Sequence, residues 1–222
     1  MKAGVLLLAL VLSACATGPT PNDYSAFRSA NLRSILVVPA LNNSVAVEAP
    51  DFLLPTIARP FAERGYYVFP LHMVKRVLEE DGLSDAGLVH SADASHFGRL
   101  FGCDAVLFVT IQRWDSQYVL LATTTTVQFD YALKSCQTGE ELWVHTRTMQ
   151  YSPQSSSSGN LLADLIANAV VAAIERAAPN YLPLTQQANA LAAAQPGLGL
   201  PAGPYLADQY GRDARQFPSQ EQ

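Results

Sequence analysis

Residues 104–151 decide the fold: DAVLFVTIQRWDSQYVLLATTTTVQFDYALKSCQTGEELWVHTRTMQY. From Tyr118 to Lys134 the side chains alternate with a period of two, which is the spacing of a strand with one buried face. One face of this strand carries mainly apolar side chains, namely Val119, Leu121, Val127, Phe129, Tyr131 and Leu133, and the other carries Gln128, Asp130 and Lys134. The alternation predicts a long, half-buried strand.

The flanking segments predict two further strands. Residues Asp104 to Trp114 are rich in Val, Leu, Phe and Ile, and they run almost directly into the long strand. A tight turn at Gln137-Thr138-Gly139 leads into a third strand, Glu140 to Tyr151. Three consecutive strands with short connections form an antiparallel meander.

Upstream of this meander, strands alternate with helices. The expected elements are a strand at 34–39, a helix at 50–64, a strand at 66–69, and helices at 71–81 and 91–101. Pro55 and Pro60 count against an uninterrupted first helix, and the second of them is expected to kink or split it. Ser91 is the expected cap of the last of these helices. The alternation predicts a parallel sheet with right-handed crossovers.

Downstream, Ser155 to Ser158 predict a loop and residues 161–178 a helix with a broad apolar face that includes Leu165 and Val170. Its small residues allow close packing on the sheet or on a partner. A membrane-spanning helix is the less favoured alternative, because the segment contains three charged residues.

The expected fold is α/β, with a mixed five-stranded sheet in the order βαβααβββα. The expected divisions are a signal peptide at 1–14, a lipidated cysteine and tether at 15–32, one domain at 33–185, and a tail rich in Pro, Ala and Gly at 186–222. The tail is expected either to be poorly ordered or to extend over the domain.

Composition excludes some classes of protein. Of 222 residues, 49% are hydrophobic and only 15% are charged, so the chain contains enough apolar side chains to fold. The net charge is −5, and no cluster of Lys and Arg offsets it. Nucleic acid is therefore not an expected partner, because binding to phosphates requires clustered positive charge.

The first 15 residues have the organisation of an export signal. Met1-Lys2 is positively charged, Val5 to Leu12 is apolar, and Leu-Ser-Ala-Cys ends at Cys15. This ending resembles the lipobox of bacterial lipoproteins, in which the chain is cut between Ala14 and Cys15 and the cysteine carries fatty acids such as palmitate. The alternatives are a plain secretory signal with an incidental cysteine or a short membrane helix, although the apolar run is too short to span a bilayer.

Position 16 is Ala rather than Asp, which in the sorting rule of enteric lipoproteins implies the outer membrane. A tether of 17 residues, 16–32, would reach roughly 55 to 60 Å when fully extended. Tyr24 and Phe27 within it are expected to dock on the domain surface.

No catalytic constellation is expected. The serines at 155–158 lack the strand–turn–helix context of a nucleophile. Four histidines, His72, His90, His96 and His145, are scattered without metal-ligand spacing, so neither a metal nor any cofactor other than the lipid on Cys15 is expected. Asp104 is expected to accept hydrogen bonds in a turn. Cys103 and Cys136 form either a disulfide, as an oxidising compartment permits, or two small buried side chains.

Four segments together resemble one family. They are DYSAFRSANLRSILVVPALNNS at 23–44, ERGYYVFP at 63–70, FGCDAVLFVTIQRW at 101–114 and TGEELW at 138–143. The chain resembles, over roughly residues 1–185, the bacterial lipoproteins represented by a neisserial surface-lipoprotein vaccine candidate. This resemblance implies a domain similar to the amino-terminal domain of TolB and to the periplasmic domain of CsgG. It also implies a poorly defined function, often encoded beside a CsgG-like lipoprotein, and the chain departs from the family after about Leu191.

Two functional hypotheses follow. The first is an outer-membrane assembly module that associates with itself, for example as a dimer, or with a CsgG-like lipoprotein. Trp143 on the last strand is expected at the interface or in the core, and Leu165 and Val170 at the interface. The second is an envelope hydrolase or small-ligand binder with a site near Asn42 and Asn43, at the ends of the parallel strands. Whether the domain faces the periplasm or the exterior stays open.

Overall fold

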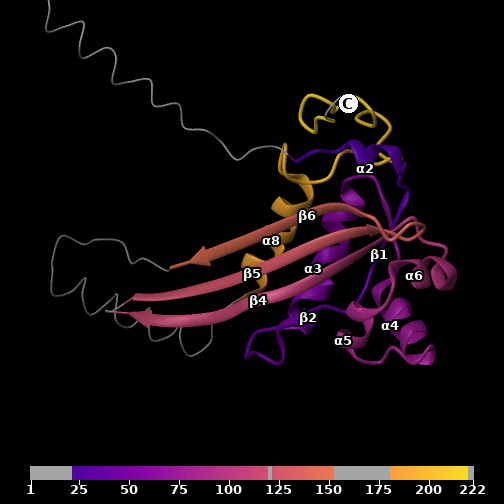
Figure 1. The fold of residues 1–222 in the computed structure, drawn as a ribbon. Coiled ribbons are helices and arrows are strands. Elements are labelled where there is room, and N and C mark those ends of the chain that lie inside the picture. Colours follow the sequence, from indigo (N-terminus) through magenta and orange to yellow (C-terminus); the bar gives the residue numbers. More distant parts are fainter. Residues whose placement is uncertain (1–21, 120–121, 153–180, 220–222) are drawn as a thin grey trace, which may run out of the picture.

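The computed structural model describes residues 22–119, 122–152 and 181–219, as Figure 1 shows. The helices are α2 (Ser25–Ser29), α3 (Ala49–Glu63), α4 (Leu71–Glu80), α5 (Ala86–Ser91), α6 (Ala94–Phe101) and α8 (Tyr181–Ala194). The strands are β1 (Ser34–Val37), β2 (Leu41–Asn42), β3 (Tyr67–Val68), β4 (Ala105–Val119), β5 (Ala122–Ser135) and β6 (Glu141–Tyr151).

The strands form one mixed sheet, which confirms the expected fold class. Its order is β3-β1-β4-β5-β6, and β2 also pairs with β4. β1 runs parallel to β3 and β4, whereas β4, β5 and β6 form the predicted antiparallel meander. β2 was not expected, because a two-residue strand is too short to have a detectable period.

The hairpin between β4 and β5 is longer than the sequence predicted. We expected the first strand to end at Trp114, but the ladder continues from Asp115↔Thr126 to Val119↔Ala122. The register shifts between Ile111 and Arg113. This bulge resets the alternation, so that Trp114 stays buried and the polar residues after it remain in the strand instead of forming a turn.

α3 is one helix of 15 residues that contains both Pro55 and Pro60, so the expected split is wrong. A proline removes one backbone hydrogen bond, and each of these two lies outside the buried stripe of the helix. The side chains of Leu53, Ile57 and Phe61 are fully buried at a spacing of four residues. Their packing holds the helix together across both prolines.

The last helix before the meander begins at Ala94, and its cap lies two residues later than the expected Ser91. Ser91 ends α5, a helix that was not predicted, and Asp93 caps α6 by accepting a hydrogen bond from the backbone N–H of Ser95 at 2.8 Å. Aspartate is as good an N-cap as serine, so composition alone did not distinguish the two positions.

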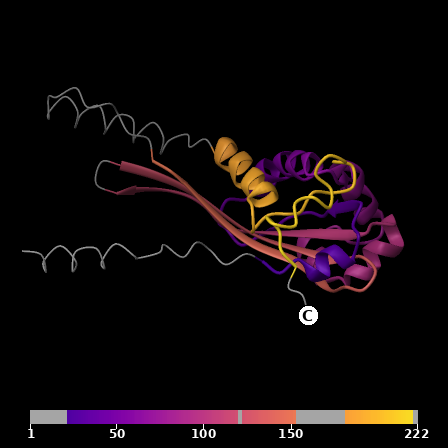
Figure 2. The same ribbon diagram turned by 90° about the horizontal axis from the view of Figure 1, so that it is seen from above.

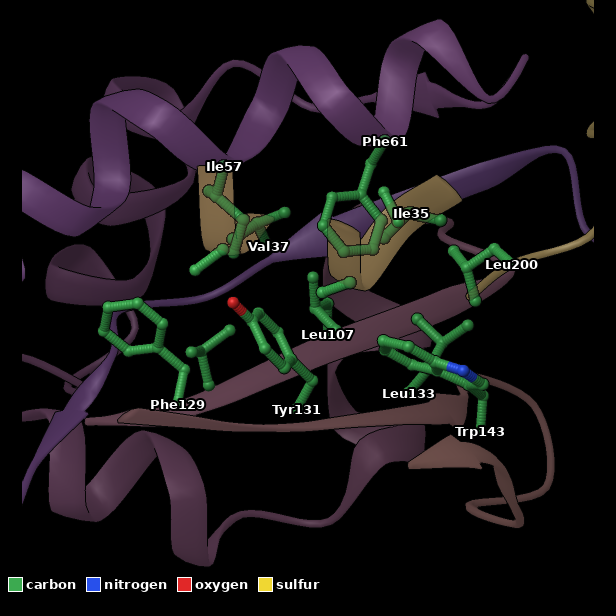
Figure 3. Close-up of a cluster of buried hydrophobic side chains, with 14 of the residues drawn as sticks. Ile35, Val37, Ile57, Phe61, Leu107, Phe129, Tyr131, Leu133, Trp143 and Leu200 are labelled. Atoms are coloured by element: carbon green, nitrogen blue, oxygen red, sulfur yellow. The ribbon is translucent and has the colours of Figure 1, made fainter. Parts of the chain in front are cut away.

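Each face of the sheet carries its own core. The face under α3 and α8, drawn in Figure 3, buries large side chains that include Ile35, Val37, Ile57, Phe61, Leu107, Phe129, Tyr131, Leu133, Trp143 and Leu200. The opposite face packs against α4, α5 and α6 and buries Leu36, Val38, Val74, Leu78, Val89, Phe97, Val106 and Phe108. Figure 2 shows that the strands of the β4–β5 hairpin extend well beyond the described helices.

Both ends of the described chain belong to the folded body. The expected domain boundary at residue 185 lies inside α8, which buries Leu184, Ala188 and Ala192 and packs on α3. The alanines of this segment suggested a tail, but they are the small residues that let α8 and α3 approach closely. At the other end, Tyr24 and Phe27 dock as expected, with 0% and 4% exposure, but residues 23–32 are part of the core rather than a tether.

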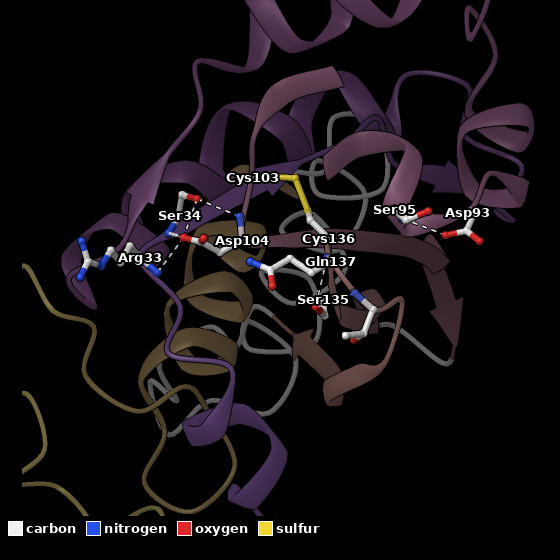
Figure 4. The surroundings of a disulfide bond; sticks show 10 residues. Arg33, Ser34, Asp93, Ser95, Cys103, Asp104, Ser135, Cys136 and Gln137 are labelled. Carbon is white, nitrogen blue, oxygen red and sulfur yellow. Dashed lines mark hydrogen bonds between the residues drawn. A yellow bond between two sulfur atoms is a disulfide. The ribbon is translucent and has the colours of Figure 1, made fainter. Parts of the chain in front are cut away.

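A disulfide joins Cys103, just before β4, to Cys136, just after β5, with a Cα–Cα distance of 5.9 Å (Figure 4). Beside it, the Asp104 carboxylate accepts hydrogen bonds from the backbone N–H groups of Arg33 and Ser34 at 3.0 and 2.9 Å. Asp104 accepts backbone hydrogen bonds, but from the start of β1 and not within a turn as expected, and it thereby ties the start of β1 to the start of β4.

Replacing both cysteines of this disulfide by alanine is expected to lower the free energy of unfolding by about 3 to 4 kcal/mol, because the bond closes a loop with a sequence separation of 33. Urea unfolding with and without a reductant measures the loss. Reductant should destabilise the wild type and leave the double variant unchanged. Equal midpoints for the two oxidised proteins would contradict the prediction.

Candidate functional site

The two ends of the described chain meet in an arrangement that we call the terminal clamp: Asn22, Tyr24 and Arg28 on one side, and residues 197–199 and 213–218 on the other. At its centre is Asp213, whose side chain is 8% exposed. Its carboxylate lies 3.2 Å from Arg28 and 3.6 Å from Arg64, and it accepts a hydrogen bond from the backbone N–H of Ala202 at 2.6 Å. One carboxylate thus joins the start of the chain, the end of α3 and the C-terminal segment.

Aromatic rings surround this ion cluster. The ring of Phe217 lies edge-on to Tyr24, with centroids 5.3 Å apart, and the guanidinium of Arg64 lies 5.4 Å from its centroid. The Tyr24 hydroxyl donates a hydrogen bond to the carbonyl of Gly199 at 2.6 Å. Burial raises the pKa of Tyr24 and lowers the pKa of Arg64, and Asp213 opposes the second shift. The tyrosine therefore stays neutral and acts as a donor.

Backbone hydrogen bonds complete the clamp. The N–H of Asn22 donates to the carbonyl of Gly197 at 2.9 Å, and the N–H of Tyr24 donates to the carbonyl of Pro218 at 3.1 Å. The chain is therefore fixed from residue 22 onward. Sequence reasoning missed this site, because a single aspartate in a segment without periodicity gives no signal of its distant arginines.

A cleft lies between the end of β1 and the N-terminal parts of α3 and α4, which pack on opposite faces of the sheet. It has a volume of about 360 Å³ and is lined by residues that include Pro39, Asp51, Leu54, His72 and Lys75. Such a crevice is where open α/β sheets bind ligands. We call it the switch-point cleft.

Asn42 and Asn43, the residues expected near such a site, do not line this cleft. The side chain of Asn42 bonds to the carbonyl of Ala46 and to Ser44, and that of Asn43 donates to Gln112. Their amides hold the β2 loop in place.

The open face of the meander carries a polar row. Asp130 accepts hydrogen bonds from Gln112 and from Thr146, each at 2.7 Å. Next to this row is a second hollow, of about 320 Å³, with His90, Phe108 and Lys134 on its wall. Burial lowers the pKa of His90, whose ring nitrogen lies 3.0 Å from the carbonyl of Pro39. The row links three strands through neutral groups and one carboxylate.

Of the other three histidines, His145 lines the same hollow as His90, whereas His72 and His96 do not. His96 contacts Asp81 at 2.6 Å, His72 lines the switch-point cleft, and His145 stacks on Trp143 with centroids 5.7 Å apart. Within residues 22–119, 122–152 and 181–219, no three His, Cys, Asp or Glu side chains group in a way that could hold a metal ion.

Trp143 lies in the core, which decides between its two expected positions. It is 4% exposed, and its indole N–H donates to the carbonyl of Leu198 at 2.7 Å. The C-terminal segment covers it, so it is not available to a partner. The other expected site residues, Ala14, Cys15, Leu165 and Val170, lie outside the described residues.

None of the helices in the described part of the chain has the length and apolar character needed to cross a membrane.

Comparison with known proteins identifies the family. The sequence profile described as "Putative lipoprotein GNA1162-like" matches residues 22–205. The chain belongs to this family. The match runs past the expected boundary at 185 and includes α8, the Gly197–Gly199 segment and Ala202, so the expected departure from the family after about Leu191 is wrong.

A neisserial lipoprotein is similar to this member of the GNA1162-like family in both sequence and structure. "Putative lipoprotein NMB1124/NMB1162" of Neisseria meningitidis serogroup B is 36% identical over 173 residues, which cover 77% of this chain and 80% of that protein. The crystal structure of lipoprotein GNA1162 from Neisseria meningitidis has a TM-score of 0.53 and 36% identity, over 64% of this chain and 97% of that chain.

Replacing Asp213 by Asn is expected to lower the free energy of unfolding by about 3 kcal/mol, because two partly buried arginines lose their counter-charge. Chemical denaturation measures the loss. Asp208→Asn, at an exposed position of the same segment, is the matched control and should change stability little. Equal losses in the two variants would refute the role of the clamp.

His145 is expected to make stability depend on pH. Burial, with a smaller contribution from Arg147, lowers its pKa to about 4, so between that value and its ordinary pKa the unfolded chain binds more protons than the folded one. Stability should be complete above about pH 6.5 and fall towards pH 4, by about 1 to 2 kcal/mol. His145→Phe, which keeps a ring against Trp143, should flatten this part of the profile. A variant with the wild-type pH profile would exclude His145 as the cause.

Proposed function

We propose that this GNA1162-like protein is a non-catalytic assembly module, anchored in the outer membrane through lipid on Cys15, that associates through the far end of its meander. The lipobox ending at Cys15 and the alanine at position 16 support the anchor and the membrane. Fatty acids on one cysteine suffice for stable attachment when several chains are present.

The long meander is the observation that carries the assembly role. β4 and β5 have 15 and 14 residues, while the helices of the described residues cover the part of the sheet near β1 (Figure 1). In the described sheet order β6 is the last strand, so no strand of this sheet lies along its outer side. Backbone groups on such an edge can pair with a strand of a second chain.

The side chains of this end also favour contact with a protein. Tyr118 and Tyr151, near the end of the hairpin, are 40% and 48% exposed, and Thr148 and Gln150 are exposed on β6. Tyrosines contribute much of the contact area in protein interfaces. The proposed partner is a second copy of the chain or, following the family resemblance, a CsgG-like lipoprotein.

The switch-point cleft supports a second candidate function, the binding of a small ligand. Its volume of about 360 Å³ lies within the range of small-molecule sites. Binding there would place a ligand between α3 and α4, away from the meander.

Adding charge to the edge strand tests the assembly role. The double variant Thr148→Lys and Gln150→Lys should convert an oligomer to a monomer, because charged side chains on an edge strand oppose pairing with a second strand. Light scattering and crosslinking of the lipidated protein in detergent measure the mass. Met73→Lys, at a 51% exposed position on α4, is the control and should assemble like the wild type. A wild type that stays monomeric, and that crosslinks to no CsgG-like lipoprotein, would overturn the proposal.

A further inference from the structure

The terminal clamp limits how far the folded body can move from a lipid on Cys15. The backbone is fixed at Asn22 by its hydrogen bond to Gly197. Six residues lie between Cys15 and Asn22, and the seven residue-to-residue steps span at most about 25 Å when the chain is fully extended. A tether that ran to residue 32 would have more than doubled this reach. The clamped end of the body is thus held near the membrane surface.

One segment lies beside this end, the loop formed by residues 203–217. Tyr210 donates a hydrogen bond from its hydroxyl to Asn31 at 2.8 Å, and Asp213 pairs with Arg28. Figure 1 shows this loop, in yellow, next to α2 and on the opposite side of the sheet from α4 and α5. The loop and the point where the chain enters the body therefore share one side of the molecule.

The exposed side chains of the loop suit a lipid headgroup region. Tyr205 and Tyr210 are 67% and 44% exposed. Arg212 and Arg215 are also exposed, against one exposed carboxylate, Asp208. The second aspartate of the loop, Asp213, is neutralised by its two arginines. In a chain with a net charge of −5, this surface is locally positive.

Tyrosine rings are enriched at the depth of lipid headgroups, and arginine side chains extend towards phosphates. Because the anchor holds the bilayer within reach, even a weak contact becomes effectively intramolecular and is populated. A second copy of the chain is not tethered next to the loop, so its contact with the loop would not become intramolecular in this way.

We propose that the 203–217 loop lies on the phospholipid surface, so that α4 and α5 point away from the membrane. This orientation rests on the proposed lipid anchor at Cys15.

Tryptophan quenching tests the orientation. Both native tryptophans are buried, at 2% and 4% exposure, so a third one introduced at the surface adds a separable signal. Tyr205→Trp places it on the loop, and Leu88→Trp, at a 51% exposed position on α5, is the matched control. The lipidated variants are reconstituted in vesicles of phosphatidylethanolamine and phosphatidylglycerol, with and without brominated acyl chains.

The expected result is that bromine quenches the added fluorescence of Tyr205→Trp about twofold more than that of Leu88→Trp, because a ring at headgroup depth is near the acyl chains. Arg212→Glu with Arg215→Glu in the Tyr205→Trp protein should reduce the quenching. Equal quenching at the two positions, or stronger quenching of Leu88→Trp, would overturn the proposed orientation.

Flotation of the same vesicles separates this proposal from the anchor on which it rests. The wild type should float with the vesicles, and Cys15→Ser should not. If Cys15→Ser floats equally well, the anchor itself is refuted. If flotation depends on Cys15 but quenching is equal, the anchor holds and the orientation alone fails.

Discussion

The buried charge of Asp213 is the constraint on which the arrangement of the chain ends depends. A carboxylate with 8% exposure is stable in this place only because Arg28 and Arg64 face it and a backbone N–H bonds to it. These partners come from three separate segments, so the ion cluster forms only when all three are in place. It fixes where the chain enters the body, and with that the distance between the body and its proposed lipid.

The two ends of the mixed sheet differ in role: one end is stabilised by helices, and the other is the proposed binding surface. Near β1, helices cover both faces and bury two cores, and the disulfide at Cys136 closes the end of the meander that lies beside them. Farther along, the same strands continue beyond the helices that the structure describes, up to Val119 and Ala122. The part that stabilises the fold and the part proposed to bind a partner are therefore segments of the same three strands.

Regular periodicity allowed much of this fold to be predicted. The alternation through Val127, Phe129 and Tyr131 fixed the meander, and the apolar run at 34–37 fixed β1. Two local predictions were wrong. The bulge near Ile111 interrupts the alternation, so the continuation of β4 was not predicted, and Asp93 could not be distinguished from Ser91 as the helix cap. The terminal clamp was beyond prediction, because Arg28 and Asp213 are separated by 185 residues and neither belongs to a periodic segment. Burial of Trp143 depended in the same way on a segment that read as a tail.

The central claim is that the chain is fixed to the body from Asn22, so that only a short length of chain separates the body from the proposed lipid anchor at Cys15. Amide hydrogen exchange of the lipidated protein measures this directly at Asn22, Tyr24 and Arg28, whose N–H groups are bonded to Gly197, Pro218 and Tyr24. The account predicts exchange at these amides that is strongly slowed, together with that of residues 213–217. Exchange at the rate of an unstructured peptide up to residue 32, with the sheet still protected, would contradict it.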